Sequence, residues 1–234
     1  MIKYISKNRS YEKLIPKGVV LHETATPGAT AENEYNYFNN GNRGASAHAF
    51  VDWNGFIQTV PYNEVAWHAG YTANHKYIGV EMCRPKTHNP EQFKKVWDNT
   101  ISLFICILSL YKLSADDIFT HHQISLKWGE TDHTDPTAFL KEYGKTFEDF
   151  KNEIKEKMEG GLSMTQYEEL KRLISANKEK VYHYTKDIPE YGRKTIQKLL
   201  DKGYLKGESE SDLNLPESMF RTLVILDRAG VFDK

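Results

Sequence analysis

The segment AHAFVDWNGFIQTV, residues 47–60, places two apolar runs on either side of Asn54-Gly55. An Asn-Gly pair between two such runs is the strongest short-range signal of a β-hairpin, because both residues tolerate the positive φ angles of a tight turn. We therefore predict antiparallel strands at residues 47–52 and 56–60.

Further strands and helices are predicted on both sides of this hairpin. The apolar run in residues 17–23 predicts a buried strand that carries His22 near its C-terminal end, and residues 76–82 predict another strand. Helices are predicted at residues 31–40, at 90–112 behind an Asn89 N-cap and Pro90, and at 139–158. Strands that alternate with helices indicate a mixed α/β domain over residues 1–158, with a central β-sheet flanked by helices.

A glycine pair then interrupts the pattern, and we expect residues 159–163 to be a linker. Helical patterns begin again at Ser163 and recur at about 193–201 and 216–228. Residues 164–234 are therefore predicted to form a small, separate all-α domain.

The composition is that of a folded chain without a strongly charged surface. Hydrophobic residues make up 39% of the chain, and 31 basic against 32 acidic residues leave a net charge of −1, so no nucleic-acid partner is expected. The longest apolar run, residues 101–110, has about half the length that a bilayer-spanning helix needs. Because the first ten residues also lack the apolar core of a signal peptide, we expect a soluble cytosolic chain without a membrane partner.

Two separated segments carry side chains that suit a metal ion. His22 ends a predicted strand, whereas His121, His133 and Asp135 share a predicted loop, the polar segment 120–136. A catalytic Zn²⁺ takes three nitrogen, oxygen or sulfur ligands and leaves the fourth position for water. Isolated histidines are more often structural, and we assign that role by default to His48, His68, His75, His88 and His183. The combination of residues, rather than any one of them, predicts a metal-dependent hydrolase.

Six short motifs follow one another along the chain, at residues 20–25, 46–51, 64–70, 78–81, 120–121 and 133–136. In sequence and in order they resemble the motifs of the zinc-dependent N-acetylmuramoyl-L-alanine amidases of type 2, relatives of peptidoglycan recognition proteins and of many phage endolysins. The resemblance covers roughly residues 15–145. It implies a peptidoglycan hydrolase that cleaves the amide between N-acetylmuramic acid and L-alanine with a zinc-activated water.

The resemblance also assigns roles to individual residues. His22 and Asp135 match the first and third zinc ligands, and one Zn²⁺ is expected in the catalytic domain. His121 and His122 compete for the second ligand position; the spacing to Ile124 favours His121. The predicted strand residue Glu81 matches the family's catalytic carboxylate, and the alternative is a structural ion pair with Arg84.

Further roles in the substrate groove follow from the same resemblance. His133 stands where relatives carry a lysine or a histidine that hydrogen-bonds the oxyanion. Trp67, His68 and Tyr71 are expected to line the groove for the glycan and stem peptide, and His122 is a groove residue if His121 binds zinc. Because Asp135 replaces the cysteine ligand of many members, Cys83 and Cys106 should be dispensable buried residues.

The biological setting is predicted as that of a phage endolysin of a Gram-positive host. Such a chain waits in the host cytoplasm until it is released to the cell wall. The alternatives are a bacterial or prophage autolysin, a non-catalytic peptidoglycan-binding module, and a different zinc hydrolase such as a peptidase. The last is disfavoured because the chain has no His-Glu-x-x-His motif.

The C-terminal domain more weakly resembles the short C-terminal modules of Gram-positive phage endolysins. We expect it to bind a cell-wall ligand, and the alternative is a folding or oligomerisation appendage. The codons of Glu159-Gly160-Gly161 can contain a ribosome-binding sequence upstream of Met164. The gene could therefore yield a fragment that starts at Met164 and forms an oligomer with the full-length chain.

Overall fold

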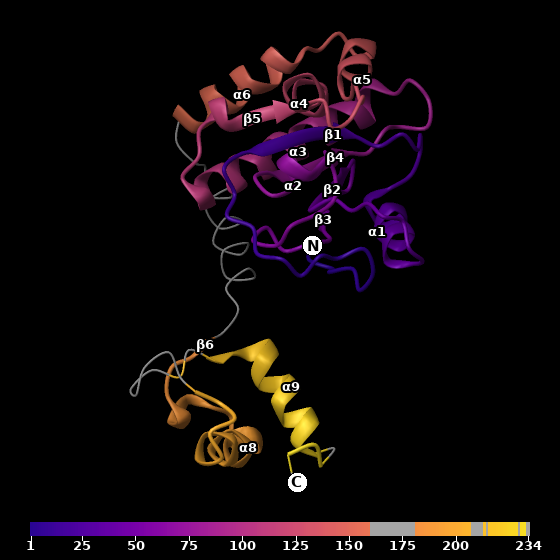
Figure 1. Cartoon of the computed structure of the whole chain (residues 1–234). Helices are drawn as coiled ribbons and strands as arrows, with labels where there is room; N and C mark the ends of the chain where they lie inside the picture. Colours follow the sequence, from indigo (N-terminus) through magenta and orange to yellow (C-terminus); the bar gives the residue numbers. More distant parts are fainter. Residues whose placement is uncertain (160–180, 207–212, 214, 229, 233–234) are drawn as a thin grey trace. The chain divides into compact units, whose positions relative to one another are not determined.

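The computed structural model describes residues 1–159, 181–206, 213, 215–228 and 230–232 (Figure 1). The chain divides into two compact units, Met1–Ser175 and Ala176–Lys234. Most of the predicted linker, the helix predicted from Ser163, and the internal start at Met164 lie outside the described residues.

The first unit is built on a five-stranded mixed sheet with the strand order β3-β2-β4-β1-β5. The strands are β1 (Val19–Glu23), β2 (Ala49–Asp52), β3 (Gly55–Gln58), β4 (Ile78–Met82) and β5 (Ile118–Thr120). β1 runs parallel to β4 and β5, and β2 runs parallel to β4. β2 and β3 form the antiparallel hairpin predicted at Asn54-Gly55, so the expectation of a mixed α/β sheet is confirmed.

One face of the sheet packs against the long helix α3 (Pro90–Tyr111). Val19 and Leu21 of β1 share a buried cluster with α3, as do the alternate residues Ile78, Val80 and Met82 of β4. The side chain of Asn89 caps the helix by accepting the N–H of Gln92 at 3.0 Å. Although α3 is 22 residues long, no helix in the described part of the chain is long and apolar enough to cross a membrane.

The opposite face carries α1 (Ala31–Asn39), α2 (Tyr71–Asn74) and α4 (His121–Trp128). Val20 of β1 packs there against Ile124 of α4, and Phe50 of β2 packs against α1. Because side chains alternate between the faces of a strand, His22 and Glu81 also point to this second face. The alternation therefore brings polar residues of β1 and β4 to the same side as α1 and α4.

Two predicted segments differ from the structure. Residues 139–158 form two helices, α5 (Thr137–Glu142) and α6 (Phe147–Glu159), rather than one. They are separated at Gly144, whose φ of 66° ends the first helix, and Thr146 caps the second through the N–H of Asp149. His121 was expected in a loop but is the first residue of α4, which Thr120 and Gln123 cap reciprocally.

The second unit has its own small core and is mostly helical. Its described elements are β6 (Val181–Tyr182), the 3₁₀ turn η2 (Thr185–Asp187), α8 (Glu190–Asp201), β7 (Leu215–Pro216) and α9 (Glu217–Arg228). Both predicted helices are present, and the short antiparallel pair β6–β7 adds strands that were not predicted. Tyr182, Ile196 and Phe220 are among the buried residues that hold this unit together.

Candidate active site

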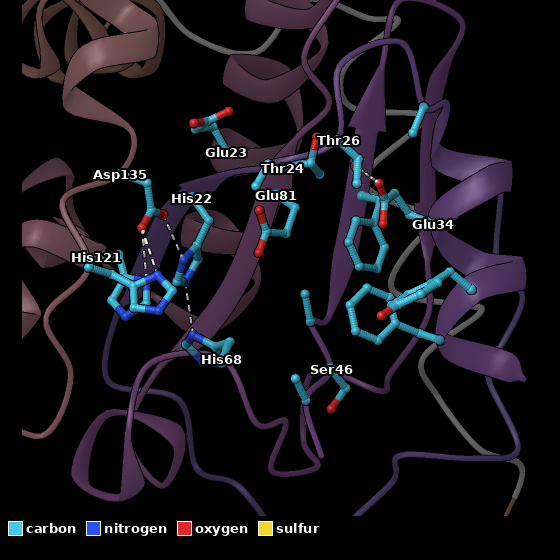
Figure 2. Close-up of a pocket in the computed structure, with 18 of the residues that line it drawn as sticks. His22, Glu23, Thr24, Thr26, Glu34, Ser46, His68, Glu81, His121 and Asp135 are labelled. Carbon is cyan, nitrogen blue, oxygen red and sulfur yellow. Dashed lines mark hydrogen bonds and ion pairs between the residues drawn. The ribbon is translucent and has the colours of Figure 1, made fainter. Parts of the chain in front are cut away.

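A pocket of about 880 Å³ opens on the second face of the sheet, over the C-terminal ends of β1 and β4 (Figure 2). His22 and Glu81 are Cα partners in the β1–β4 pairing and both line the pocket. The two residues are almost sixty positions apart in the sequence, but the parallel pairing places their side chains next to each other. The sheet, rather than a single loop, therefore positions these two residues in the pocket.

His22, His121 and Asp135 form a compact cluster at one end of the pocket (Figure 2). Nδ1 of His22 lies 3.2 Å from one carboxylate oxygen of Asp135, and Nδ1 of His121 lies 3.1 Å from the other. One potential ligand atom from each residue lies within 4.8 Å of the others. Both histidines are almost completely buried, at 2% and 3% exposure.

The electrostatics of the cluster favour a cation. Burial lowers the pKa of His22, and the neighbouring imidazoles of His121 and His133 add to this effect against the opposing Asp135. Burial raises the pKa of Asp135, but hydrogen bonds with His121 and His22 outweigh it and hold that pKa well below its usual range. A neutral His22 and an ionised Asp135, with a second buried imidazole nitrogen, match the donor set of a mononuclear Zn²⁺ site.

His121 and His122 lie in different places. The ring of His121 is in the cluster, with its Nε2 lying 3.1 Å from the hydroxyl of Thr131. His122 contributes its backbone N–H, which donates to the carbonyl oxygen of Asp135 at 3.1 Å. Its side chain is not among those that line the pocket, because it follows His121 on a helix and therefore points about 100° away from it.

Glu81 lies beside the cluster without a cationic partner among the described residues. Burial raises the pKa of its carboxyl group well above the ordinary value, and the carboxylates of Asp135, Glu34 and Glu23 raise it further. One of its oxygens, Oε2, is buried and has no hydrogen-bond partner in the described part of the chain. Arg84, the structural partner considered for Glu81, pairs instead with Glu23 and Glu142, at 3.6 and 3.0 Å.

Of the other predicted site residues, some line the pocket and Tyr71 does not. His133 lines the pocket with a side chain that is 61% exposed, and its ring stacks on His121 with the centroids 4.4 Å apart. Trp67 and His68 line the pocket as expected of groove residues. Tyr71 does not line it: it begins α2, is 75% exposed, and packs on His75.

The far end of the pocket contains residues that the sequence did not single out. Glu34 of α1 is buried there and accepts a hydrogen bond from the hydroxyl of Thr26 (Figure 2). Phe38 and Phe50 supply apolar walls. Burial raises the pKa of the Glu34 carboxyl group despite the hydrogen bond from Thr26. A charged residue in a predicted amphipathic helix is usually exposed, so no sequence signal marks this position.

Two histidines and a carboxylate around one point, with a further carboxylate that has no cationic partner among the described residues, match the donor arrangement of mononuclear metal hydrolases. The sequence model of the N-acetylmuramoyl-L-alanine amidase family matches residues 12–138. The chain therefore belongs to this family, and the expectation of an N-acetylmuramoyl-L-alanine amidase is confirmed at the level of the family.

Curated relatives and solved structures agree with this assignment. Protein Ami of Listeria monocytogenes is 32% identical over 186 residues, which cover 76% of this chain and 18% of Ami. A bifunctional autolysin of Staphylococcus aureus is 31% identical over 61% of this chain and 12% of its own length. This chain thus spans less than a fifth of either relative.

Among solved structures, the Staphylococcus aureus hydrolase AmiA in complex with its ligand aligns with a TM-score of 0.60 and 28% identity, over 67% of this chain and 82% of AmiA. A mutant endolysin from Bacillus subtilis aligns with a TM-score of 0.55 and 26% identity, over 66% and 97% of the two chains. Both likenesses support the mixed α/β fold.

Proposed function

We propose that this chain cleaves the amide bond between N-acetylmuramic acid and the L-alanine of the peptidoglycan stem peptide. The observation that carries the proposal is the cluster of two buried histidines, His22 and His121, with Asp135, and Glu81 of β4 next to it. All the donors of a metal hydrolase are present. A module that only binds peptidoglycan would not require them, so catalysis is favoured over the non-catalytic alternative.

The chain's own residues suit the steps of amide hydrolysis. A Zn²⁺ ion held by His22, His121 and Asp135 would supply a water of lowered pKa and polarise the scissile carbonyl. The carboxylate of Glu81 accepts the proton of the attacking water, and a carboxylate with a raised pKa is a better base. Glu81 then donates this proton to the leaving nitrogen of L-alanine.

His133 is placed to act on the carbonyl oxygen of the substrate. Its ring lies at the open side of the cluster, stacked on His121, and its Nδ1 is 3.5 Å from a carboxylate oxygen of Asp135. We propose that an N–H of this ring donates a hydrogen bond to the oxyanion that forms during attack. Trp67 would contact the glycan or stem peptide in the pocket.

The experiment combines zinc analysis with digestion of purified cell walls. The purified chain is expected to bind one equivalent of zinc and to release peptides with new L-alanine N-termini. Glu81→Gln should retain the zinc but lose roughly 10²- to 10⁴-fold in kcat/KM, because it removes the general base without removing a ligand. Stoichiometric zinc without new L-alanine N-termini would refute the amidase proposal.

We further propose that the chain is a phage endolysin that stays in the cytoplasm of a Gram-positive host until the membrane is permeabilised. The alignment over nearly the whole length of a Bacillus subtilis endolysin supports this role, whereas the autolysin relatives support the alternative. Expression inside a Gram-positive cell separates the two. An endolysin should leave the cells intact until a pore-forming agent is added, and lysis without such an agent would favour an exported autolysin.

The second unit is proposed to bind a cell-wall ligand and so to hold the enzyme on its polymeric substrate. An oligomer with a fragment that starts at Met164 is a separate proposal. Replacing Met164 by leucine should abolish a short product on expression, and a short product that persists in this variant would refute the internal start.

A further inference from the structure

Four groups form a continuous series of contacts that runs from Tyr77 to Asp135 in the cluster of His22, His121 and Asp135. The carbonyl oxygen of Tyr77 lies 3.1 Å from Nε2 of His68, Nδ1 of His68 lies 3.0 Å from Nε2 of His22, and Nδ1 of His22 lies 3.2 Å from Asp135. The carbonyl and the carboxylate at the two ends can only accept hydrogen bonds. Two neutral imidazoles provide two N–H groups for three contacts, so one contact must lack a proton.

The position of the missing proton decides which nitrogen of His22 is free. If either contact of His68 lacked the proton, two lone pairs would face each other in a partly buried place, and a polar group would be left unsatisfied. At the contact between His22 and Asp135, a metal cation can take the place of the proton. Nε2 of His22 then carries hydrogen, and its Nδ1 is bare and faces the cluster.

We propose that His68 is a positioning residue that fixes the Nε2–H tautomer of His22 and thereby presents the bare Nδ1 to a bound Zn²⁺. This inference rests on the zinc site of the proposed function. It gives His68 a role different from that expected from the sequence, because His68 acts on the metal through His22 rather than on the substrate.

The surroundings of His68 hold its ring in this position. The ring lies directly against Gly79 of β4, where an added Cβ would come within 2.5 Å of Cγ of His68. Gly79 is held in turn by His48, whose Nδ1 accepts the N–H of Gly79 at 2.9 Å and whose Nε2 donates to the carbonyl oxygen of Glu64 at 2.8 Å. The backbone N–H of His68 donates to the side chain of Asn74 at 2.8 Å.

His121 has no comparable constraint. Its Nε2 contacts the hydroxyl group of Thr131 at 3.1 Å, and this hydroxyl group lies 2.7 Å from that of Ser125. A hydroxyl group can either donate or accept, so this series of contacts does not dictate which nitrogen of His121 carries hydrogen. The series through His68 does dictate it for His22, because it ends on a backbone carbonyl.

The first test is nitrogen NMR of the zinc-loaded, full-length protein labelled with ¹⁵N-histidine. We expect His22 to carry its proton on Nε2 and to bind zinc through Nδ1, with the Nε2 proton shared with His68. Zinc bound through Nε2 of His22, or hydrogen on its Nδ1, would overturn the proposal. This measurement needs no variant and so does not depend on the folding of one.

The second test measures zinc affinity by competition with a chromophoric chelator. His68→Phe removes both polar atoms, and Gly79→Ala displaces the ring without removing a polar side chain. Both should weaken zinc binding by roughly 10- to 100-fold, which is typical for loss of an outer hydrogen-bond partner of a ligand. His68→Gln should recover most of the affinity, because its amide can accept from His22 and donate to Tyr77.

His88→Phe is the matched control, because it makes the same substitution at an exposed histidine outside the pocket. If His68→Phe binds zinc as tightly as the wild type and changes KM alone, His68 contacts substrate and the proposal is wrong. If His68→Phe does not fold, a His68→Gln variant that folds but binds zinc as weakly as Gly79→Ala would likewise overturn it. A wild-type chain that binds no zinc would instead refute the proposed metal site itself.

Discussion

His133 is the residue proposed to hydrogen-bond the oxyanion. Its ring is exposed at the pocket, stacked on His121 and 3.5 Å from Asp135. Histidine side chains lose their charge between about pH 5 and 8, whereas lysine remains cationic to about pH 10. If the cationic form stabilises the oxyanion, kcat/KM of the wild type should fall as the pH rises, and His133→Lys should retain activity to higher pH.

The measurement is the pH profile of kcat/KM for both proteins on the same soluble muropeptide. The two alkaline limbs should be separated, with that of the lysine variant at the higher pH. Superimposed alkaline limbs would show that the charge of residue 133 does not limit the reaction.

His48 predicts a pH dependence of stability rather than of activity. Burial lowers the pKa of His48 to about 4, against the opposing hydrogen bond with Glu64. The unfolded chain protonates this histidine near the ordinary pKa of 6.5. Above that pH both states hold His48 neutral, and its burial does not reduce the free energy of unfolding. As the pH falls from 6.5 to about 4, only the unfolded chain takes up the proton, and the free energy of unfolding decreases by up to about 1.4 kcal/mol per pH unit.

The matched variant is His48→Gln, whose amide can keep both hydrogen bonds but does not titrate. Urea unfolding between about pH 4 and 7 should give a smaller decrease in unfolding free energy for the variant than for the wild type. Tryptophan fluorescence suits this measurement, because all four tryptophans lie between residues 53 and 128, in the first unit. Parallel pH dependences would contradict the assignment of a buried, neutral His48.

The residue types at the site were readable from the sequence, but their spatial relations were not. His22 at a strand end and the polar segment that contains Asp135 indicate a metal site from the sequence alone. The pairing of β1 with β4 puts Glu81 beside His22. This pairing is non-local, and the residue pattern within a strand does not reveal which strand it pairs with. The same applies to His68, whose contacts with His22 and Tyr77 depend on the tertiary fold.

At the scale of the elements, the hairpin and the capped helix α3 were predicted best. The Asn-Gly turn and the Asn89-Pro90 helix start are local signals, and both elements are present in the structure. The division between α5 and α6 was missed because apolar residues recur at helical spacing on both sides of Gly144. A single glycine within such a pattern is compatible with one continuous helix, so only the tertiary packing decides.

The N-cap of α3 can be tested directly. Asn89→Ala removes the acceptor for the N–H of Gln92 and should lower the unfolding free energy of the first unit by about 0.5–2 kcal/mol. Glu91→Ala, a change in the same turn away from the cap hydrogen bond, is the control. Equal effects of the two substitutions in urea unfolding would show that the cap itself contributes little.

At the scale of the whole molecule, the two units have separate hydrophobic cores. The core of the first unit is formed between the sheet, α3 and α6, and includes Phe150. That of the second unit is formed between α8, α9 and the β6–β7 pair around Phe220. Small cores confer little stability, so the second unit should be the more sensitive to the loss of a buried side chain.

Phe220→Ala should therefore unfold the second unit selectively. Truncation of a buried phenylalanine costs about 3–5 kcal/mol, which is comparable to the whole stability of so small a unit. In calorimetry of the full-length chain, the transition of the second unit should shift to lower temperature or disappear. The transition seen by tryptophan fluorescence should not change, since every tryptophan lies in the first unit.

Phe150→Ala provides the reciprocal control, because it should lower the fluorescence transition and spare the second unit. The pair of variants also bears on the role proposed for the second unit. Phe220→Ala should keep its kcat/KM on a soluble muropeptide but digest insoluble cell walls more slowly, because the enzyme loses its second contact with the polymer. Equal loss on both substrates would mean that the second unit supports the catalytic unit itself, and would refute a function confined to docking.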